Sequence, residues 1–142
     1  MPLPADLLAR LSETFPADSL ATGQAERIAY SYDNSRRRAL PDAVVFATRH
    51  AQVEGLIRAC REHQVPVIAR GRGSNTTGAT VPVQGGVVLS FERMNRILRI
   101  DPDNRLAVVE PGVLNGDLQT ALAVHGFFWP PDPSSAPWCT IG

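Results

Sequence analysis

The apolar residues of this chain recur with a spacing that changes along the sequence, and each change predicts a new element. In residues 4–15 they return every three or four positions, which predicts a helix with one apolar side. Residues 43–47 and 65–69 are short apolar runs of the kind found in buried strands. Between these runs the helical spacing returns up to about His63, with Thr48 as the expected N-cap. The apolar stripe of that helix comprises Val53, Leu56, Ile57 and Cys60.

A strand, a helix and a strand within so short a stretch form a βαβ unit, so we expect the two strands to be parallel. Beyond this unit, three strand-like runs cover residues 86–91, 97–100 and 106–110. The turn-forming sequence Asp-Pro-Asp-Asn separates the last two runs and predicts an antiparallel hairpin. A helix then fits the residues from Asn115, the expected N-cap, to about His125. The expected fold class is therefore α+β, with a small βαβ lobe followed by a mixed or antiparallel α+β lobe.

A glycine-rich loop, residues 70–79 (RGRGSNTTGA), leaves the carboxyl end of the second strand and is expected at the junction of the two lobes. Ligands of open α/β sheets bind at this edge. The loop does not fit a Rossmann fingerprint, because Thr76 occupies the position of its third glycine, or a P-loop, because Ala79 occupies the lysine position. A nest of backbone N–H groups for a pyrophosphate fits it, and a solvent-facing hairpin loop is the alternative. The polar residues 31–43 are expected to cross the surface.

The last segment, residues 127–142 (FFWPPDPSSAPWCTIG), combines aromatic residues, hydroxyl groups and four prolines. Prolines stiffen a segment, so its polar groups can be presented at a low entropic cost. Taken alone, the segment fits a rigid surface turn. Taken together with the glycine-rich loop, it predicts two walls of one cofactor groove.

Composition adds mainly exclusions. The 142 residues are enough for about one domain, and 44% of them are hydrophobic and 20% charged, as in ordinary globular domains. The net charge of zero gives no reason to expect nucleic-acid binding. Cys60 and Cys139 lie too far apart for a metal-binding cluster, so no metal site is expected. Neither a signal peptide nor an apolar run of the ~20 residues that span a bilayer is present, so we expect no transmembrane segment and a cytoplasmic location.

From about Tyr30 to the end, the chain resembles the vanillyl-alcohol oxidase/p-cresol methylhydroxylase type of FAD-linked oxidases, and within it the glycolate oxidase and D-lactate dehydrogenase (cytochrome) branch. Three stretches carry the resemblance in the family's order: PVIARGRGSNTTGATVPVQGGVVLSFERMNRIL, VEPGVLNGDL and GFFWPPDPSSAPWCTIG. Residues 1–29 precede the resemblance and are expected to form an N-terminal helical segment, from the helical spacing of residues 4–15. The resemblance implies that residues 30–142 are the N-terminal part of an FAD-binding domain that continues beyond the sequence given.

The resemblance also implies which residues contact FAD. Backbone amides of the glycine-rich loop would hold the pyrophosphate, a Pro-Gly turn would lie near the flavin, and the last segment would line the isoalloxazine ring and the ribityl chain. Some relatives carry a histidine in this loop that bonds covalently to the flavin; here Ser74 and Asn75 stand nearby, so we expect non-covalent FAD. The implied contacts are Gly71, Arg72, Gly73, Ser74, Asn75, Thr76, Gly78, Pro111, Gly112, Asp132, Ser135, Thr140 and Gly142.

The function that the resemblance implies is oxidation of a 2-hydroxy acid, such as D-lactate or glycolate, by hydride transfer to FAD. A quinone, a cytochrome or oxygen would then accept the electrons, and the protein would be cytoplasmic or peripheral at the inner membrane. The substrate-binding and catalytic residues would lie beyond Gly142, so none is named, and homo-oligomerisation is left open. The alternatives are a non-catalytic module that binds a phosphorylated metabolite and an assembly module.

Overall fold

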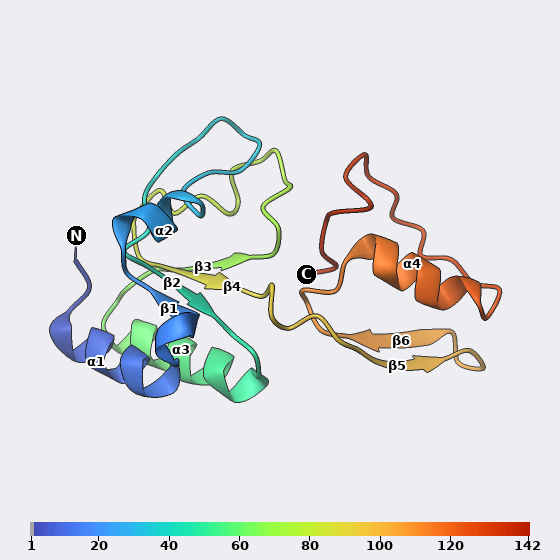
Figure 1. Cartoon of the computed structure of the whole chain (residues 1–142), viewed down its shortest axis with the longest axis horizontal. Coiled ribbons are helices and arrows are strands. Elements are labelled where there is room, and N and C mark those ends of the chain that lie inside the picture. The colour runs from blue at the N-terminus through green and yellow to red at the C-terminus, as the bar shows by residue number, and fades with distance from the viewer. Residues whose placement is uncertain (1) are drawn as a thin grey trace.

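The computed structural model describes residues 2–142 and arranges them in two lobes that lie side by side (Figure 1). The first lobe contains a four-stranded sheet with helices, and the second contains a two-stranded hairpin with one helix. The predicted α+β fold class is confirmed. In chain order the elements are α1 (Ala5–Thr14), the 3-10 helix η1 (Ala17–Ser19), β1 (Leu20–Ala21), α2 (Gln24–Ile28), β2 (Ala43–Phe46), α3 (His50–Glu62), β3 (Val67–Arg70), β4 (Val87–Ser90), β5 (Ile97–Asp101), β6 (Leu106–Val109) and α4 (Asn115–Ala123).

The strand order of the first sheet is β1-β2-β4-β3. β2 and β3 both run parallel to β4, so the predicted parallel relation is confirmed, although β4 separates them. Residues 86–91, which we expected to open the second lobe, therefore belong to the first sheet. All four residues of β4 are buried, as a central parallel strand requires. The glycine-rich loop consequently connects β3 to β4 inside the first lobe. The expectation that this loop is the segment of chain that joins the two lobes is wrong.

Helices α1 and α3 cover one face of this sheet (Figure 1). Their buried side chains form a core with β2 and β4, because the apolar stripe of each helix faces the apolar side of the strands. The largest fully buried side chains in this core are Phe15, Leu7, Leu11, Leu56 and Leu89.

Two details of α3 differ from the sequence prediction. Its N-cap is Arg49, and Thr48 instead donates from N and Oγ1 to Gln52 Oε1 at 2.9 and 3.0 Å. Ile57, predicted in the apolar stripe, is 50% exposed. The buried face runs through Gln52, Leu56, Ala59 and Cys60, because α1 packs against the side of α3 that carries these residues.

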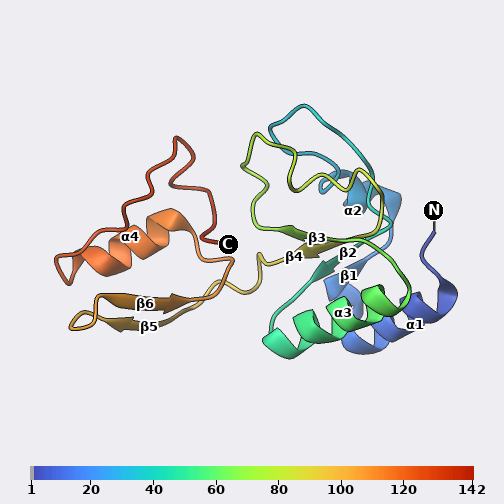
Figure 2. The same ribbon diagram turned by 180° about the vertical axis from the view of Figure 1, so that it is seen from behind.

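The opposite face of the sheet is covered by loops. Figure 2 shows residues 29–38 and the segment between β3 and β4 lying side by side above the strands. Hydrogen bonds join them, including Asn34 N to Asn75 O at 3.1 Å. The polar segment 31–43 is therefore more than a surface crossing, and Ser31 and Asp33 within it are buried.

In the second lobe, β5 and β6 form the predicted antiparallel hairpin. Asp101 closes its turn by accepting hydrogen bonds from Asn104 N and Nδ2 at 3.2 and 3.0 Å. α4 packs on one face of the hairpin through Leu118 and Leu122. The helix begins one residue earlier than predicted, at Asn115 with Leu114 as N-cap, and it ends at Ala123, so that His125 is exposed beyond it.

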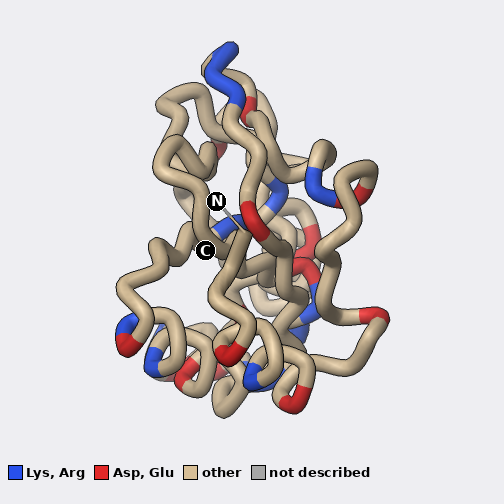
Figure 3. Tube along the Cα trace, turned by 90° about the vertical axis from the view of Figure 1, so that its left-hand side faces the viewer, with Lys and Arg blue, Asp and Glu red and all other residues tan. Residues whose placement is uncertain are grey.

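Acidic and basic residues are interspersed along the helices at the bottom of Figure 3. Among residues 2–142, no helix combines the length and apolar character needed to cross a membrane.

Glu110 and Arg96 close the open end of the hairpin. Arg96 donates to the buried Glu110 carboxylate from N at 2.8 Å, from Nε at 3.1 Å and from Nη2 at 2.6 Å. These hydrogen bonds hold the pKa of Glu110 below its ordinary value of 4.5. A carboxylate with a lowered folded-state pKa stabilises the fold above the unfolded-state pKa, and that stability is lost as the pH falls through the folded-state pKa.

We therefore expect Glu110→Gln to unfold at lower urea concentration than the wild type at neutral pH. The difference between the two proteins should shrink as the pH falls below about 4.5 and then through the lower pKa of the folded wild-type carboxylate, because the ion pair is lost once Glu110 is protonated. Urea unfolding of both proteins at a series of pH values measures this difference. Parallel pH profiles would show that the ion pair does not contribute to stability.

Candidate functional site

Two adjoining cavities form a groove between the lobes, at the carboxyl ends of β3 and β4. Their volumes are about 450 and about 170 Å³, and Arg72 and Glu92 line both. The chain end also lies between the lobes (Figure 1). We call this space the inter-lobe groove. Its first cavity is lined by Ala29, Tyr30, Tyr32, Asp33, Asn34, Arg70, Arg72, Gly73, Ser74, Glu92 and Trp138, and its second by Arg72, Glu92, Asn95, Gly112, Leu114, Asp117 and Thr140.

The first wall of the groove is the start of the glycine-rich loop. Arg72, Gly73 and Ser74 line it, and within residues 2–142 the N–H groups of residues 71–76 donate no hydrogen bond. Gly73 has a φ of +66°, a left-handed conformation that glycine adopts without steric cost. A run of free N–H groups around such a residue presents partial positive charge, which suits an anion.

The rest of the loop faces away from the groove. Asn75 Oδ1 accepts hydrogen bonds from Thr77 N and Oγ1, both at 3.1 Å, and Asn75 Nδ2 donates to Thr80 Oγ1 at 3.1 Å. Thr76 is exposed. Gly78 lies against the neighbouring loop, where an added Cβ would be 2.9 Å from Arg37 Cδ. Asn75, Thr76 and Gly78 therefore shape the loop and do not line the groove.

The second wall is built from residues 111–114 and 140–142, which run alongside each other. Gly142 N donates to Pro111 O and Ile141 N donates to Val113 O, both at 2.9 Å. The two walls meet at Gly71, where an added Cβ would lie 1.9 Å from Thr140 Oγ1 and 3.0 Å from Gly142 O. The structure thus brings the glycine-rich loop and the chain end into contact across the groove.

Asp132 and Ser135 lie outside the groove. Asp132 is exposed, and the Ser135 carbonyl accepts hydrogen bonds from Trp138 N and Cys139 N at 2.8 Å in a turn.

Two amide side chains of α4 hold the proline-rich segment beside this turn. Asn115 Nδ2 donates to Pro131 O at 3.0 Å, and Gln119 accepts from Trp129 N at 2.9 Å while donating to the Trp129 carbonyl.

Among the groove residues that the sequence reasoning missed are Arg70, Glu92 and Tyr30. Arg70 donates to the Tyr32 carbonyl at 2.8 Å, and its guanidinium lies 5.5 Å from the centre of the Tyr30 ring. Tyr30 OH donates to Glu92 Oε1 at 3.2 Å, and burial together with the Glu92 charge raises the pKa of Tyr30 to about 12. Arg70 ends β3 and Glu92 follows β4 closely, so a charged residue at the carboxyl end of an apolar run was the available signal.

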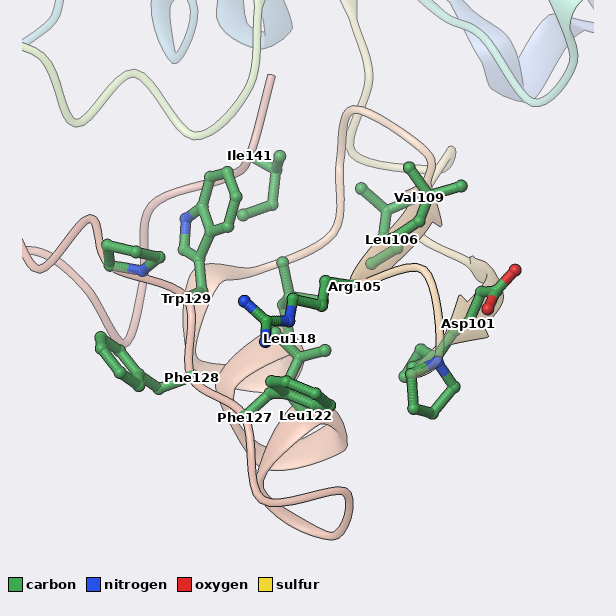
Figure 4. Close-up of a pocket in the computed structure, with 14 residues that line it drawn as sticks. Asp101, Arg105, Leu106, Val109, Leu118, Leu122, Phe127, Phe128, Trp129 and Ile141 are labelled. Carbon is green, nitrogen blue, oxygen red and sulfur yellow. The ribbon is translucent and has the colours of Figure 1, made fainter.

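A third cavity, of about 440 Å³, lies within the second lobe and is mainly apolar. Figure 4 shows Phe127, Phe128 and Trp129 on one side of it and Leu106 and Val109 on the other. The two tryptophans are thereby separated, since Trp129 lines this cavity and Trp138 lines the inter-lobe groove.

Known proteins are similar to this chain in sequence and in fold. Residues 41–142 match the family described as FAD binding domain. The chain is 39% identical over 138 residues to the glycolate oxidase subunit GlcD of Bacillus subtilis, covering 96% of this chain and 29% of that protein. It is 31% identical over 143 residues to the mitochondrial D-lactate dehydrogenase (cytochrome) of Arabidopsis thaliana, covering 99% of this chain and 25% of that protein.

The structure superposes on p-cresol methylhydroxylase with substrate bound at a TM-score of 0.73 and 28% identity, covering 85% of this chain and 24% of that one. The resemblance inferred from the sequence is confirmed, including the p-cresol methylhydroxylase type of fold. The chain spans less than a third of the length of these relatives. With the family matching residues 41–142 and the fold in agreement, this chain belongs to the FAD binding domain family.

Proposed function

We propose that the inter-lobe groove holds FAD, and that the full-length protein is an FAD-dependent oxidoreductase that oxidises a 2-hydroxy acid of the D-lactate or glycolate kind. The observation that carries the proposal is the run of free N–H groups of residues 71–74 at the groove, where Gly71 meets Thr140 and Gly142 of the second wall. The family supports the cofactor, and the names of the two relatives, a glycolate oxidase subunit and a D-lactate dehydrogenase, support the substrate class.

The groove residues fit a pyrophosphate. The N–H groups of Gly71 to Ser74 are neutral donors, and no Cβ at position 71 or 73 narrows the space beside them. Arg72 lines both cavities and brings one guanidinium to the diphosphate, where it would donate charge-assisted hydrogen bonds. In this proposal Thr140, Gly142, Pro111 and Gly112 form the opposite wall, while Asn75, Thr76, Gly78, Asp132 and Ser135 keep the two walls in shape.

Bound FAD would supply the hydride acceptor for the oxidation of the hydroxy acid. The residues of this chain bind and orient the cofactor and exclude water from its diphosphate side. Substrate-binding and acid–base residues are assigned to the rest of the full-length protein. Attachment is proposed to be non-covalent, because the residue types along the groove walls include no histidine.

The test is FAD titration of the full-length protein, followed by anaerobic mixing with D-lactate, L-lactate or glycolate. We expect a yellow protein whose flavin absorption bleaches with a 2-hydroxy acid and returns when a quinone, a cytochrome or oxygen is added. Denaturation in acid should release the flavin into the supernatant. A protein that stays colourless with excess FAD would contradict the proposal. A yellow protein that no 2-hydroxy acid reduces would contradict the substrate class alone.

A further inference from the structure

Arg70 is a charged side chain buried inside the first lobe. It is 7% exposed, although it ends β3 next to the groove. Its guanidinium donates to the Tyr32 carbonyl at 2.8 Å and to Thr80 Oγ1 at 3.3 Å, and it stacks on Tyr30. A buried charge is costly to the fold unless it is well partnered, so such a group calls for a physical explanation. Among the described residues, Arg70 forms no ion pair within 4 Å.

The guanidinium of Arg70 lies directly against Gly73. An added Cβ at position 73 would be 2.3 Å from Arg70 Nη2, 2.5 Å from Cζ and 2.9 Å from Nη1. All three atoms belong to the rigid planar end of a side chain that is already fixed by Tyr32 and Thr80. The guanidinium therefore lies against the loop at the residue whose backbone is left-handed, with φ +66°.

We propose that Arg70 is a positioning residue of the glycine-rich loop. Its guanidinium supports Gly73 from inside the lobe and joins the loop to Tyr32 and Thr80. This support keeps the N–H groups of residues 71–74 turned away from intrachain acceptors and available to an anion in the groove. The inference rests on the proposed function only in that FAD affinity is one of its two readouts.

A different role would place the charge of Arg70 in direct contact with the diphosphate, since the residue lines the groove. The two roles differ in what they require of the side chain. Direct charge contact is satisfied by any cation of similar reach, and it weakens as ionic strength rises. Arg70 donates to both acceptors from Nη1, while Nη2 and Cζ lie against Gly73. Support of Gly73 therefore requires the whole planar guanidinium, which the single nitrogen of a lysine does not supply.

The experiment is a double-mutant cycle in the full-length protein with Arg70→Ala, Gly73→Ala and the double variant. FAD affinity is measured well below the melting temperature, and thermal unfolding is measured without FAD. Each single change should weaken FAD binding by about tenfold or more. The loss caused by Gly73→Ala should be smaller by about tenfold in the Arg70→Ala background, because the clash with the guanidinium has been removed. The strain of a left-handed alanine is the same in both backgrounds and would give additive effects.

Gly126→Ala is the matched control. Gly126 also has a positive φ, +75°, but an added Cβ there meets nothing within 4 Å. Its substitution should lower the melting temperature equally in both Arg70 backgrounds and leave FAD affinity unchanged. Arg70→Lys provides the third arm, and should lose about as much affinity as Arg70→Ala at every salt concentration.

Additive losses in both readouts would overturn the proposal. Wild-type affinity in Arg70→Lys, with a strong salt dependence, would instead assign Arg70 to direct contact with the diphosphate. If the wild type binds no FAD, the proposed function fails, and the thermal cycle still decides whether Arg70 supports Gly73. If Gly73→Ala does not fold, Thr80→Val takes its place in the cycle, because this change removes one hydrogen-bond acceptor of Arg70 at similar side-chain volume. Thr80→Ser keeps the hydroxyl group and is the control for this variant.

Discussion

Gly112→Ala is expected to lower the free energy of unfolding by about 3 kcal/mol, because no space exists for the added methyl group. A Cβ at this buried position would lie 2.0 Å from the Phe91 carbonyl oxygen and 2.7 Å from the Met94 carbonyl oxygen. Both are backbone atoms of the segment that links the two lobes, so neither can rotate away. Gly112 N also donates to Met94 O at 2.7 Å, which fixes the approach. Urea unfolding followed by circular dichroism measures the loss.

Gly116→Ala is the matched control for this prediction. Gly116 lies four residues further on, inside α4, and an added Cβ would make an ordinary contact of 3.4 Å with Pro137 Cα. Alanine is preferred over glycine in a helix by about 0.5–1 kcal/mol, so this variant should be slightly more stable than the wild type. Equal effects of the two substitutions would refute the close approach at Gly112.

Gly71→Ala is expected to weaken FAD binding by the full-length protein by about 100-fold, since an overpacked contact costs about 3 kcal/mol. The added Cβ would lie 1.9 Å from Thr140 Oγ1 and 3.0 Å from both Thr140 Cβ and Gly142 O. Rotation of the threonine relieves only the first of these contacts, so the two walls of the groove must separate. Flavin titration monitored by absorbance or fluorescence measures the change.

The reciprocal change at Thr140 tests the same contact. Thr140→Gly removes both side-chain atoms that oppose position 71, so adding it to Gly71→Ala should recover part of the lost affinity. Gly55→Ala is the remote control, because its Cβ would lie 3.9 Å from Thr14 Cγ2 beneath the first sheet, and it should leave FAD affinity unchanged. Unchanged affinity in Gly71→Ala would mean that FAD does not require the closed groove.

Hydrophobic spacing predicted the type of most elements but not the arrangement of the strands. Residues 87–90 were recognised as a strand, yet their place between β2 and β3 depends on which apolar run is buried on both sides. Burial on both sides depends on contacts with segments that are distant in the sequence, and the spacing of apolar residues carries no information about these contacts. Ile57 was misplaced for a related reason, since the direction from which α1 approaches α3 selects which of two neighbouring stripes is buried.

The candidate site was predicted only where its chemistry is local in the sequence. The glycine-rich loop is recognisable in the sequence from its three glycines and its position after a strand. The structure places the first residues of this loop at the groove. The contact of Gly71 with Thr140 joins positions far apart in the chain, and no local pattern encodes it. Arg70 and Glu92 were overlooked because a single charged residue after an apolar run usually marks the solvated end of a strand.

Within residues 2–142, the chain passes from the first lobe to the second through residues 91–96. Any ligand held by both walls therefore acts as a reversible link between the two lobes, in addition to the hinge that residues 91–96 form. By mass action, a ligand present at 100 times its dissociation constant adds about 2.7 kcal/mol to the resistance against opening. Saturation with cofactor should consequently protect the hinge peptide bonds from proteases more than it protects either lobe.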